Sequence, residues 1–294
     1  RPTMTASSIR FATYNIQYGY GQDKSYNLDR IADAVAEADI ICMQEVTTGW
    51  KACNGDHQPD LLSARLNKYA AYAPGYETDA SHTDAGGRVV NKRRGFGNMV
   101  LSRWPIVYSR PHSLPRPPQE KVAETKADLP RCVLETVIDI PDVPLRIMSV
   151  HLSHQSRLQR LSQVAVLRAL VDGLSDESPI WKEAGTSLNP WTEGKPVPPV
   201  VGSTIIAGDF NFQPADPEYA AMLEPRASHA LIDAWAAANP GRDRATTCVE
   251  SDGSLTTLDY AFLTVGLAGS ITAARVENHT AASDHFPLLL ELEL

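Results

Sequence analysis

The sequence predicts an α/β (α+β) fold in which two mixed β-sheets pack together and helices cover their outer sides. Strand patterns outnumber helical patterns along the 294 residues. Strand patterns also follow one another directly in both halves of the chain, which is typical of sheets that contain antiparallel neighbours. Hydrophobic residues make up 43% of the chain, which is enough to fill a large core.

The first half of the chain alternates strand and helix patterns. "IRFATYNI" reads as a strand because apolar and polar residues alternate. Asn27 is a good N-cap for the helix "LDRIADAVAEA", which carries an apolar stripe at helical spacing. "DIICMQEV" is an almost continuous apolar run, as expected of a strand covered on both faces. A helix over residues 59–68 and a strand over residues 97–106, closed by Pro105, follow.

The second half begins with two strands, "RCVLETVIDI" and "LRIMSVHLSH", which the turn "PDVP" separates. A long amphipathic helix over "SRLQRLSQVAVLRALVDGL" follows. Its predicted buried face consists of Leu158, Leu161, Val164, Ala165 and Leu167. "STIIAGDF" is the next strand, and the last three are "LDYAFLT", "SITAARVEN" and "HFPLLLELEL".

The chain is expected to form a single domain over residues 1–294, with residues 1–8 as a flexible N-terminal tail. Helical and strand patterns continue from end to end without a low-complexity segment or a long charge run that would mark a linker. The longest irregular stretch covers residues 175–200. A loop of this length is usually functional or disordered.

The formal net charge of −8 argues against a broad surface for nucleic acid, although it leaves room for a local basic patch. Arg88, Lys92, Arg93 and Arg94 form such a patch in "GGRVVNKRRGFGN". Two interpretations remain open: a solvated hairpin tip, or an arm that steers an anionic substrate.

The four cysteines are scattered and include no Cys-x-x-Cys pair, so neither a zinc knot nor a redox motif is indicated. No apolar segment is long enough to span a membrane, and the N-terminus lacks a signal-peptide core. We therefore expect a cytoplasmic location, while a signal peptide removed before Arg1 would leave no trace in this sequence. The sequence indicates no oligomeric state.

Polar residues stand where the hydrophobic runs end. They are Asn15, Glu45, His151, Asp209 with Asn211, and the pair Asp284 and His285 at the start of the last strand. In "IIAGDFNFQP", Asp209 and Asn211 would point to the same side because residues two apart in a strand share a face. The alternative is turn chemistry, in which both side chains bond nearby backbone. Five such endings in one chain favour a shared site.

These segments resemble the endonuclease/exonuclease/phosphatase superfamily, which has the DNase I-like fold. The matching segments are "TYNIQ", "QEV", "GNMVLSRWPI", "SVHLSHQSRLQRLSQ", "GDFNFQP", "LDYAF" and "SDHFPL". They occur in the family's order between residues 10 and 290, so the resemblance covers essentially the whole domain. It implies a four-layer sandwich, with two mixed sheets face to face and helices on both outer sides. It also implies metal-dependent hydrolysis of a phosphoester.

The resemblance implies a metal site at Asn15, Glu45 and Asp284, usually for Mg²⁺, with Mn²⁺ as an alternative. Magnesium prefers a few carboxylate and amide oxygens together with retained water, and this set supplies them. By the same resemblance, Arg131 would lie near the phosphate, and Asn98 would bond the phosphate or His151. The alternatives are a strand-edge arginine in water and an asparagine that ends a glycine turn.

The remaining residues would carry the chemistry. By similarity, Asp209 would orient or deprotonate the attacking water, and Asn211 would hold the water or a phosphoryl oxygen. His151 and His285 would donate to the phosphoryl oxygens. In an alternative route His285 is the general base and Asp259 orients it.

The sequence thus predicts a metal-dependent phosphoesterase, either a phosphodiesterase or a phosphatase. It would hydrolyse a small-molecule or lipid-derived phosphate ester by in-line attack of an activated water. The alternative is a DNA or RNA endonuclease or exonuclease of the same fold, which the net charge disfavours. A binding module without activity should have lost Glu45, Asp209 or His285, and the chain retains all three.

Overall fold

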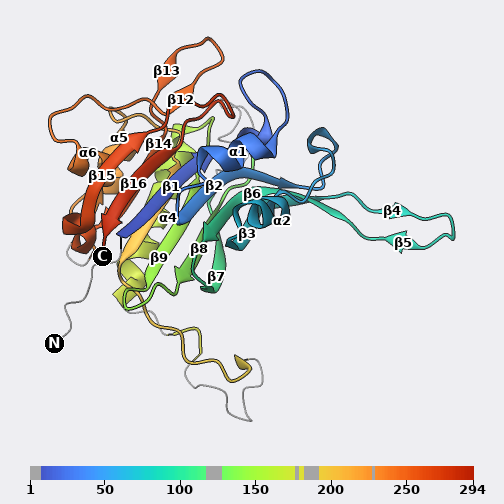
Figure 1. The fold of residues 1–294 in the computed structure, drawn as a ribbon, viewed down its shortest axis with the longest axis horizontal. Coiled ribbons are helices and arrows are strands. Elements are labelled where there is room, and N and C mark those ends of the chain that lie inside the picture. The colour runs from blue at the N-terminus through green and yellow to red at the C-terminus, as the bar shows by residue number, and fades with distance from the viewer. Residues whose placement is uncertain (1–7, 117–127, 176–178, 182–191, 227–228) are drawn as a thin grey trace.

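The computed structural model describes residues 8–116, 128–175, 179–181, 192–226 and 229–294, and it contains two six-stranded sheets (Figure 1). The tail predicted over residues 1–8 lies outside the described residues except for Ser8, which begins the first strand. Parts of the irregular stretch 175–200 also lie outside them. The single-domain interpretation stays a prediction.

The first sheet has the strand order β15-β16-β1-β2-β6-β3. In chain order, its strands are β1 (Ser8–Asn15), β2 (Ile40–Thr48), β3 (Tyr69–Asp79), β6 (Arg93–Ser102), β15 (Ile271–Val276) and β16 (Leu288–Glu293). Strands β1 and β2 are parallel, whereas the other neighbouring pairs are antiparallel. The sheet is therefore mixed, as predicted.

The second sheet has the order β11-β14-β10-β9-β8-β7. Its strands are β7 (Ile106–Ser113), β8 (Cys132–Ile138), β9 (Leu145–His151), β10 (Thr204–Asp209), β11 (Leu231–Asp233) and β14 (Asp259–Thr264). Here β9 and β10 are the parallel pair, and the other neighbours are antiparallel.

Two further hairpins extend from the sheets. Strands β4 (His82–Thr83) and β5 (Val89–Val90) continue β3 and β6 into a long arm that projects from the body in Figure 1. Strands β12 (Cys248–Val249) and β13 (Leu255–Thr256) form the other hairpin. The basic patch lies on the arm, where Arg88, Lys92 and Arg93 are exposed.

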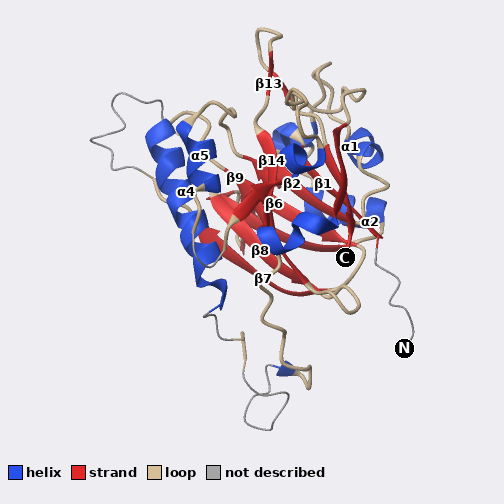
Figure 2. Cartoon of the chain, turned by 90° about the vertical axis from the view of Figure 1, so that its left-hand side faces the viewer, coloured by secondary structure: helices blue, strands red, loops and turns tan. Residues whose placement is uncertain are grey.

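Helices cover the outer face of each sheet. The described α-helices are α1 (Leu28–Ala34), α2 (Gln58–Leu66), α4 (Arg157–Asp172), α5 (Pro217–Leu223) and α6 (Ala234–Ala238). Short 3₁₀ segments are η1 (Gln17–Gly19), η2 (Lys51–Cys53), η3 (Gly173–Ser175) and η5 (Val265–Ser270). Helices α4 and α5 lie on one side of the strands in Figure 2 and α1 and α2 on the other. The predicted four-layer sandwich is confirmed. Within the described residues, no helix is both long and apolar enough to cross a membrane.

Three apolar clusters correspond to the spaces between the layers. The central cluster joins the inner faces of both sheets, for example Phe11 and Val100 of the first with Leu134 and Ile205 of the second. A second cluster packs α4 and α5 on the second sheet, and a third packs α1 and α2 on the first. Burial of both sheet faces explains the continuous apolar runs in the sequence.

Helix boundaries follow their caps, but the predicted buried face of α4 is partly wrong. Asn27 caps α1 as expected, because its side chain accepts from the backbone of the first turn. In α4, however, Leu158 and Ala165 are exposed, whereas Arg160 and Arg168 are buried. Both arginines have partners: Arg160 pairs with a glutamate of α5, and Arg168 donates to a backbone carbonyl at the end of α5. Paired polar groups therefore occupy positions that hydrophobicity alone would assign to apolar residues.

The two parallel pairs bring polar strand ends to the same edge of the sandwich. Asn15 is level with Gln44, and Asp209 is level with both His151 and Asp259. Gly208 permits this close register: its φ is +153°, and a Cβ atom there would lie 1.9 Å from the carbonyl oxygen of Val150. A larger residue would push β10 away from β9.

Candidate active site

The polar residues at the strand ends surround one cleft of about 490 Å³. Its lining includes Glu45, Arg131, His151, Asp209, Asn211, Asp284 and His285. Asn15 and Asp259 lie directly behind these residues and bond to them. The structure thus brings together residues that are far apart in the sequence and come from both sheets.

Asp209 is the centre of the cluster. Its Oδ2 atom accepts a hydrogen bond from Asn15 Nδ2 at 2.9 Å. The same oxygen lies 3.4 Å from Nε2 of His151 and 3.6 Å from Nε2 of His285. Burial raises the pKa of Asp209 to about 6, against the lowering effect of the nearby His285 charge.

His285 forms a buried pair with Asp259. Its Nδ1 lies 2.8 Å from Asp259 Oδ2, so Nδ1 carries the proton that the carboxylate accepts and Nε2 faces Asp209. Burial lowers the pKa of His285, but the carboxylates of Asp259 and Asp209 outweigh it and raise the pKa well above the usual range.

Asp284 and His285 do not begin the last strand, contrary to the prediction. Strand β16 starts at Leu288, after Pro287. Proline has no N–H to donate to a neighbouring strand, which explains the late start. The residues before it bond instead to the β12 region: Phe286 N donates to Thr247 O, and Asp284 O accepts from Val249 N.

His151 lies against Arg131. One terminal nitrogen of the guanidinium is 2.9 Å from Nδ1 and 3.1 Å from Nε2 of the imidazole. Burial, followed by the charge of Arg131, holds the pKa of His151 well below its usual range. The imidazole is therefore neutral at pH 7 and can donate one proton.

Glu45 and Asp284 are two carboxylates that line the cleft and could bind a cation. Glu45 has a φ of +58° at an irregularity in β2, and its Oε1 accepts from Asn15 Nδ2 at 3.3 Å. Burial and the charge of Asp284 raise the pKa of Glu45 to about 7, and burial also raises that of Asp284. Among the described residues, no lysine or arginine forms an ion pair with either carboxylate. Two half-buried carboxylates without a lysine or arginine ion-pair partner in the described part of the chain fit a hard divalent cation.

The tightest cluster of potential metal ligands in the described part of the chain is a different one. Ligand atoms of Asp209, Asp259 and His285 all lie within 4.8 Å of one another. Because Asp259 and His285 already bond to each other, this arrangement also suits proton transfer.

The predicted site residues Asn211 and Asn98 occupy different positions. Asn211 lies at the cleft, and its backbone N–H donates to Asp209 Oδ1 at 3.0 Å while its φ is +53°. Asn211 therefore takes part in a turn and also lines the cleft, so both interpretations of this segment apply. Asn98 instead donates from its amide nitrogen to the carbonyls of Cys132 and Ser149. It links the two sheets behind the cleft, and its predicted phosphate contact stays a prediction.

Three residues near the cleft were not singled out from the sequence. Gln17 Nε2 donates to Asp284 Oδ2 at 2.6 Å, and the Ser283 hydroxyl donates to Asn15 O at 2.8 Å. Asp128 pairs with Arg131. Gln17 stands in the matching segment "TYNIQ" and Ser283 in "SDHFPL", so the resemblance could have indicated both.

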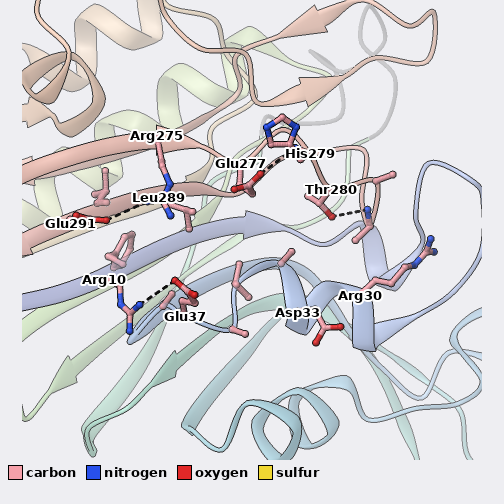
Figure 3. Close-up of a pocket in the computed structure, with 18 residues that line it drawn as sticks. Arg10, Arg30, Asp33, Glu37, Arg275, Glu277, His279, Thr280, Leu289 and Glu291 are labelled. Atoms are coloured by element: carbon pink, nitrogen blue, oxygen red, sulfur yellow. Dashed lines mark hydrogen bonds and ion pairs between the residues drawn. The ribbon is translucent and has the colours of Figure 1, made fainter.

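A larger cavity of about 670 Å³ lies between α1 and the strands β15 and β16 (Figure 3). Charged side chains on its rim pair with each other, as Arg10 with Glu37 at 3.2 Å and Arg275 with Glu291 at 3.5 Å. None of the predicted site residues lines it. We therefore do not assign the reaction to this cavity, although its volume is larger than that of the cleft.

We expect the stability of the metal-free protein to depend on the proton held by Glu45. The pKa of this group rises from 4.5 to about 7 on folding, so the stabilising contribution of its proton is fully present below about 4.5 and is lost as the pH rises through about 7. In EDTA, the free energy of unfolding of the wild type relative to Glu45→Gln should fall across this range. Urea unfolding of both proteins at each end of the range measures it. A constant difference would contradict the prediction.

Similarity to known proteins extends over nearly the whole chain. The sequence profile of the Endonuclease/Exonuclease/phosphatase family matches residues 12–285. Among solved structures, an endonuclease/exonuclease/phosphatase from Beutenbergia cavernae is 22% identical with a TM-score of 0.65, and the match covers 98% of this chain and 72% of that one. No curated protein matches the chain.

Two phosphatases also have similar structures. The 3′ phosphatase NExo from Neisseria, bound to product DNA hairpin, is 14% identical with a TM-score of 0.59, and the match covers 97% of this chain and 100% of that one. A mannosyl-6-phosphatase of Bacteroides thetaiotaomicron is 18% identical with a TM-score of 0.58 and the same two coverages. At these identities the similarity shows a shared fold.

Proposed function

The chain belongs to the Endonuclease/Exonuclease/phosphatase family, and on this premise we propose that it is a metal-dependent phosphodiesterase or phosphatase acting on a small-molecule or lipid-derived phosphate ester. One observation supports the proposal above all. The Asp209 carboxylate faces the Nε2 atoms of His151 and His285 at 3.4 and 3.6 Å, in the same cleft as Glu45 and Asp284. This arrangement supports a mechanism in which a base and two hydrogen-bond donors act beside a bound cation.

Glu45 and Asp284, with the amide of Asn15, would hold the cation, for which we propose Mg²⁺ with Mn²⁺ as an alternative. A bound divalent ion supplies positive charge that stabilises the phosphoryl and leaving-group oxygens. The oxygen-only donor set favours these hard ions over softer ones.

Asp209 would orient or deprotonate the attacking water, and Asn211 would hold the water or a phosphoryl oxygen. Both residues line the cleft, which supports these roles. The second route, in which His285 accepts the proton and Asp259 orients it, uses the same atoms. The raised pKa of His285 supports the first route, because an imidazole that is already protonated cannot accept another proton.

The donors on the other side of the phosphate would be His151, His285 and Arg131. The neutral imidazole of His151 offers one N–H, the protonated His285 offers Nε2–H, and the guanidinium adds a permanent charge. Donors fixed in a buried site stabilise charge that grows on the phosphoryl oxygens without having to reorganise.

The proposal is tested by a substrate screen with Mg²⁺ and with Mn²⁺. Bis-p-nitrophenyl phosphate, mononucleotides, inositol phosphates, phospholipid head groups, plasmid DNA and RNA would be the substrates. We expect metal-dependent hydrolysis of bis-p-nitrophenyl phosphate and of one natural class, with loss of both in EDTA. Absence of hydrolysis in every arm would contradict the proposal.

Cleavage of nucleic acid is the second candidate, and the β4–β5 arm favours it. The arm carries Arg88, Lys92, Arg93 and Arg94, and two residues beyond Arg94 the chain reaches Phe96 in the cleft. Arg94 is held in place, since its guanidinium lies 5.4 Å from the ring centroid of Trp50. If this candidate is correct, DNA or RNA would be the class that is cleaved, and its affinity would fall steeply with salt.

A cytoplasmic location is also proposed. All four cysteines are free and buried. Unpaired thiols are usual in a reducing compartment, where disulfides are rare.

A further inference from the structure

We propose that Asp128 is a positioning residue that fixes the Arg131 guanidinium against His151, on the phosphate side of the cleft. The inference rests on the proposed function, because it assigns a role within the same site. Asp128 lies just before β8 and, like Arg131, lines the cleft.

Both oxygens of the Asp128 carboxylate accept two hydrogen bonds each. Oδ1 accepts from Leu129 N at 2.7 Å and from an Arg131 terminal nitrogen at 3.2 Å. Oδ2 accepts from the Ser153 hydroxyl and from Gln155 N at 3.3 Å. Its side chain is 4% exposed. Burial raises the pKa of Asp128, but the bond from Ser153 and the charge of Arg131 outweigh it and hold the pKa below the usual range. The group is therefore ionised at neutral pH.

The guanidinium of Arg131 is held on two sides. One terminal nitrogen bonds to Asp128, and the other lies 2.9 and 3.1 Å from the ring nitrogens of His151. Asp128 is the carboxylate with which Arg131 forms an ion pair in the described part of the chain. Because the guanidinium is planar, hydrogen bonds at one edge also fix the direction of its remaining N–H donors. A flexible side chain without such a partner would not hold these donors in one orientation.

The acidic residues of the cleft explain why Arg131 needs a partner that fixes its position. Glu45, Asp209 and Asp284 line the same space, and their carboxylates would attract a guanidinium that was free to turn. Arg131 would then compete with the metal for its ligands. Pairing with Asp128 keeps the guanidinium beside His151, where it can meet the substrate phosphate.

The test compares Asp128→Asn, Arg131→Ala and the double variant in hydrolysis of bis-p-nitrophenyl phosphate. Asparagine keeps the shape but lacks the charge. We expect Asp128→Asn to lower kcat/KM by roughly 10- to 100-fold, the usual cost of losing a group that orients a ligand. The same change in the Arg131→Ala background should have no further effect. Asp142→Asn, in the exposed turn between β8 and β9, should match the wild type.

Chemical rescue separates positioning from a merely structural role. Guanidinium ion at millimolar concentration should restore part of the activity of Arg131→Ala, because the gap beside Asp128 can bind it. It should not restore the double variant. Three outcomes would overturn the proposal. The losses in kcat/KM could multiply in the double variant, Asp128→Asn could have the kcat/KM of the wild type, or guanidinium could restore Arg131→Ala and the double variant equally.

Binding of inorganic phosphate, measured calorimetrically with Mg²⁺ present, distinguishes this inference from the proposed function. We expect Asp128→Asn and Arg131→Ala to weaken phosphate binding to the same extent. A wild type that hydrolyses nothing but shows this pattern would contradict the proposed function alone. A wild type that hydrolyses phosphoesters, but whose phosphate binding neither variant weakens, would contradict this inference alone.

Discussion

Replacing Asp209 by asparagine is expected to abolish phosphoester hydrolysis while the fold stays intact. The carboxylate is the group that faces both imidazoles and accepts from Asn15. An amide cannot take a proton from water, and removal of a general base typically costs about 10²- to 10⁴-fold in rate. Asparagine has nearly the same shape as aspartate, and it removes the cost of burying a charged group. The fold should therefore stay intact. Hydrolysis of bis-p-nitrophenyl phosphate with Mg²⁺ and thermal unfolding measure the two effects.

The exposed Asp142→Asn variant serves again as the matched control. It should retain full activity and an unchanged melting temperature. A loss of less than tenfold in Asp209→Asn would show that another group activates the water, and His285 would then be the first candidate.

Replacing Glu45 by glutamine is expected to abolish hydrolysis by a different route, loss of the cation. Glu45 is half-buried, and its limited contact with water, together with the charge of Asp284, raises its pKa. Glutamine is neutral, so the substitution removes one of the negative charges that would balance a bound divalent ion. We expect weaker binding of Mg²⁺ and Mn²⁺, measured by calorimetry, together with activity that excess metal only partly restores.

Glu37→Gln is the control for this substitution. Glu37 is exposed and pairs with Arg10 at the larger cavity, so its loss should change neither metal binding nor rate. Unaltered metal affinity in Glu45→Gln would contradict the assigned ligand. An active Glu45→Gln/Asp209→Asn double variant would contradict the site as a whole.

The central strands and the edge strand β15 could be predicted from the sequence, whereas the edge strands β3, β7 and β11 could not. "DIICMQEV" is apolar because both faces of β2 are covered. Strands β3 and β7 escaped prediction. They lie at the ends of their sheets, are partly exposed, and contain Pro74 and Pro111. Proline is tolerated at an edge, where one side of the strand needs no partner, yet in a sequence it reads as a turn.

The candidate site was predictable where it depends on strand ends. Parallel neighbours must finish at the same edge, so Asn15, His151 and Asp209 meet there. The supporting contacts depend instead on loops that approach each other only in the folded protein. Gln17 reaches Asp284 across 267 positions of the chain, and Asp128 meets Ser153 through the loop before α4. No local pattern encodes such pairs.

The hydrogen bond from Asn15 to Asp209 joins strands that belong to opposite sheets. The bond therefore exists only where the two sheets pack face to face. Separation of the sheets would break it and would divide the polar strand ends between two surfaces, so the integrity of the cleft depends on the same interface that forms the central core.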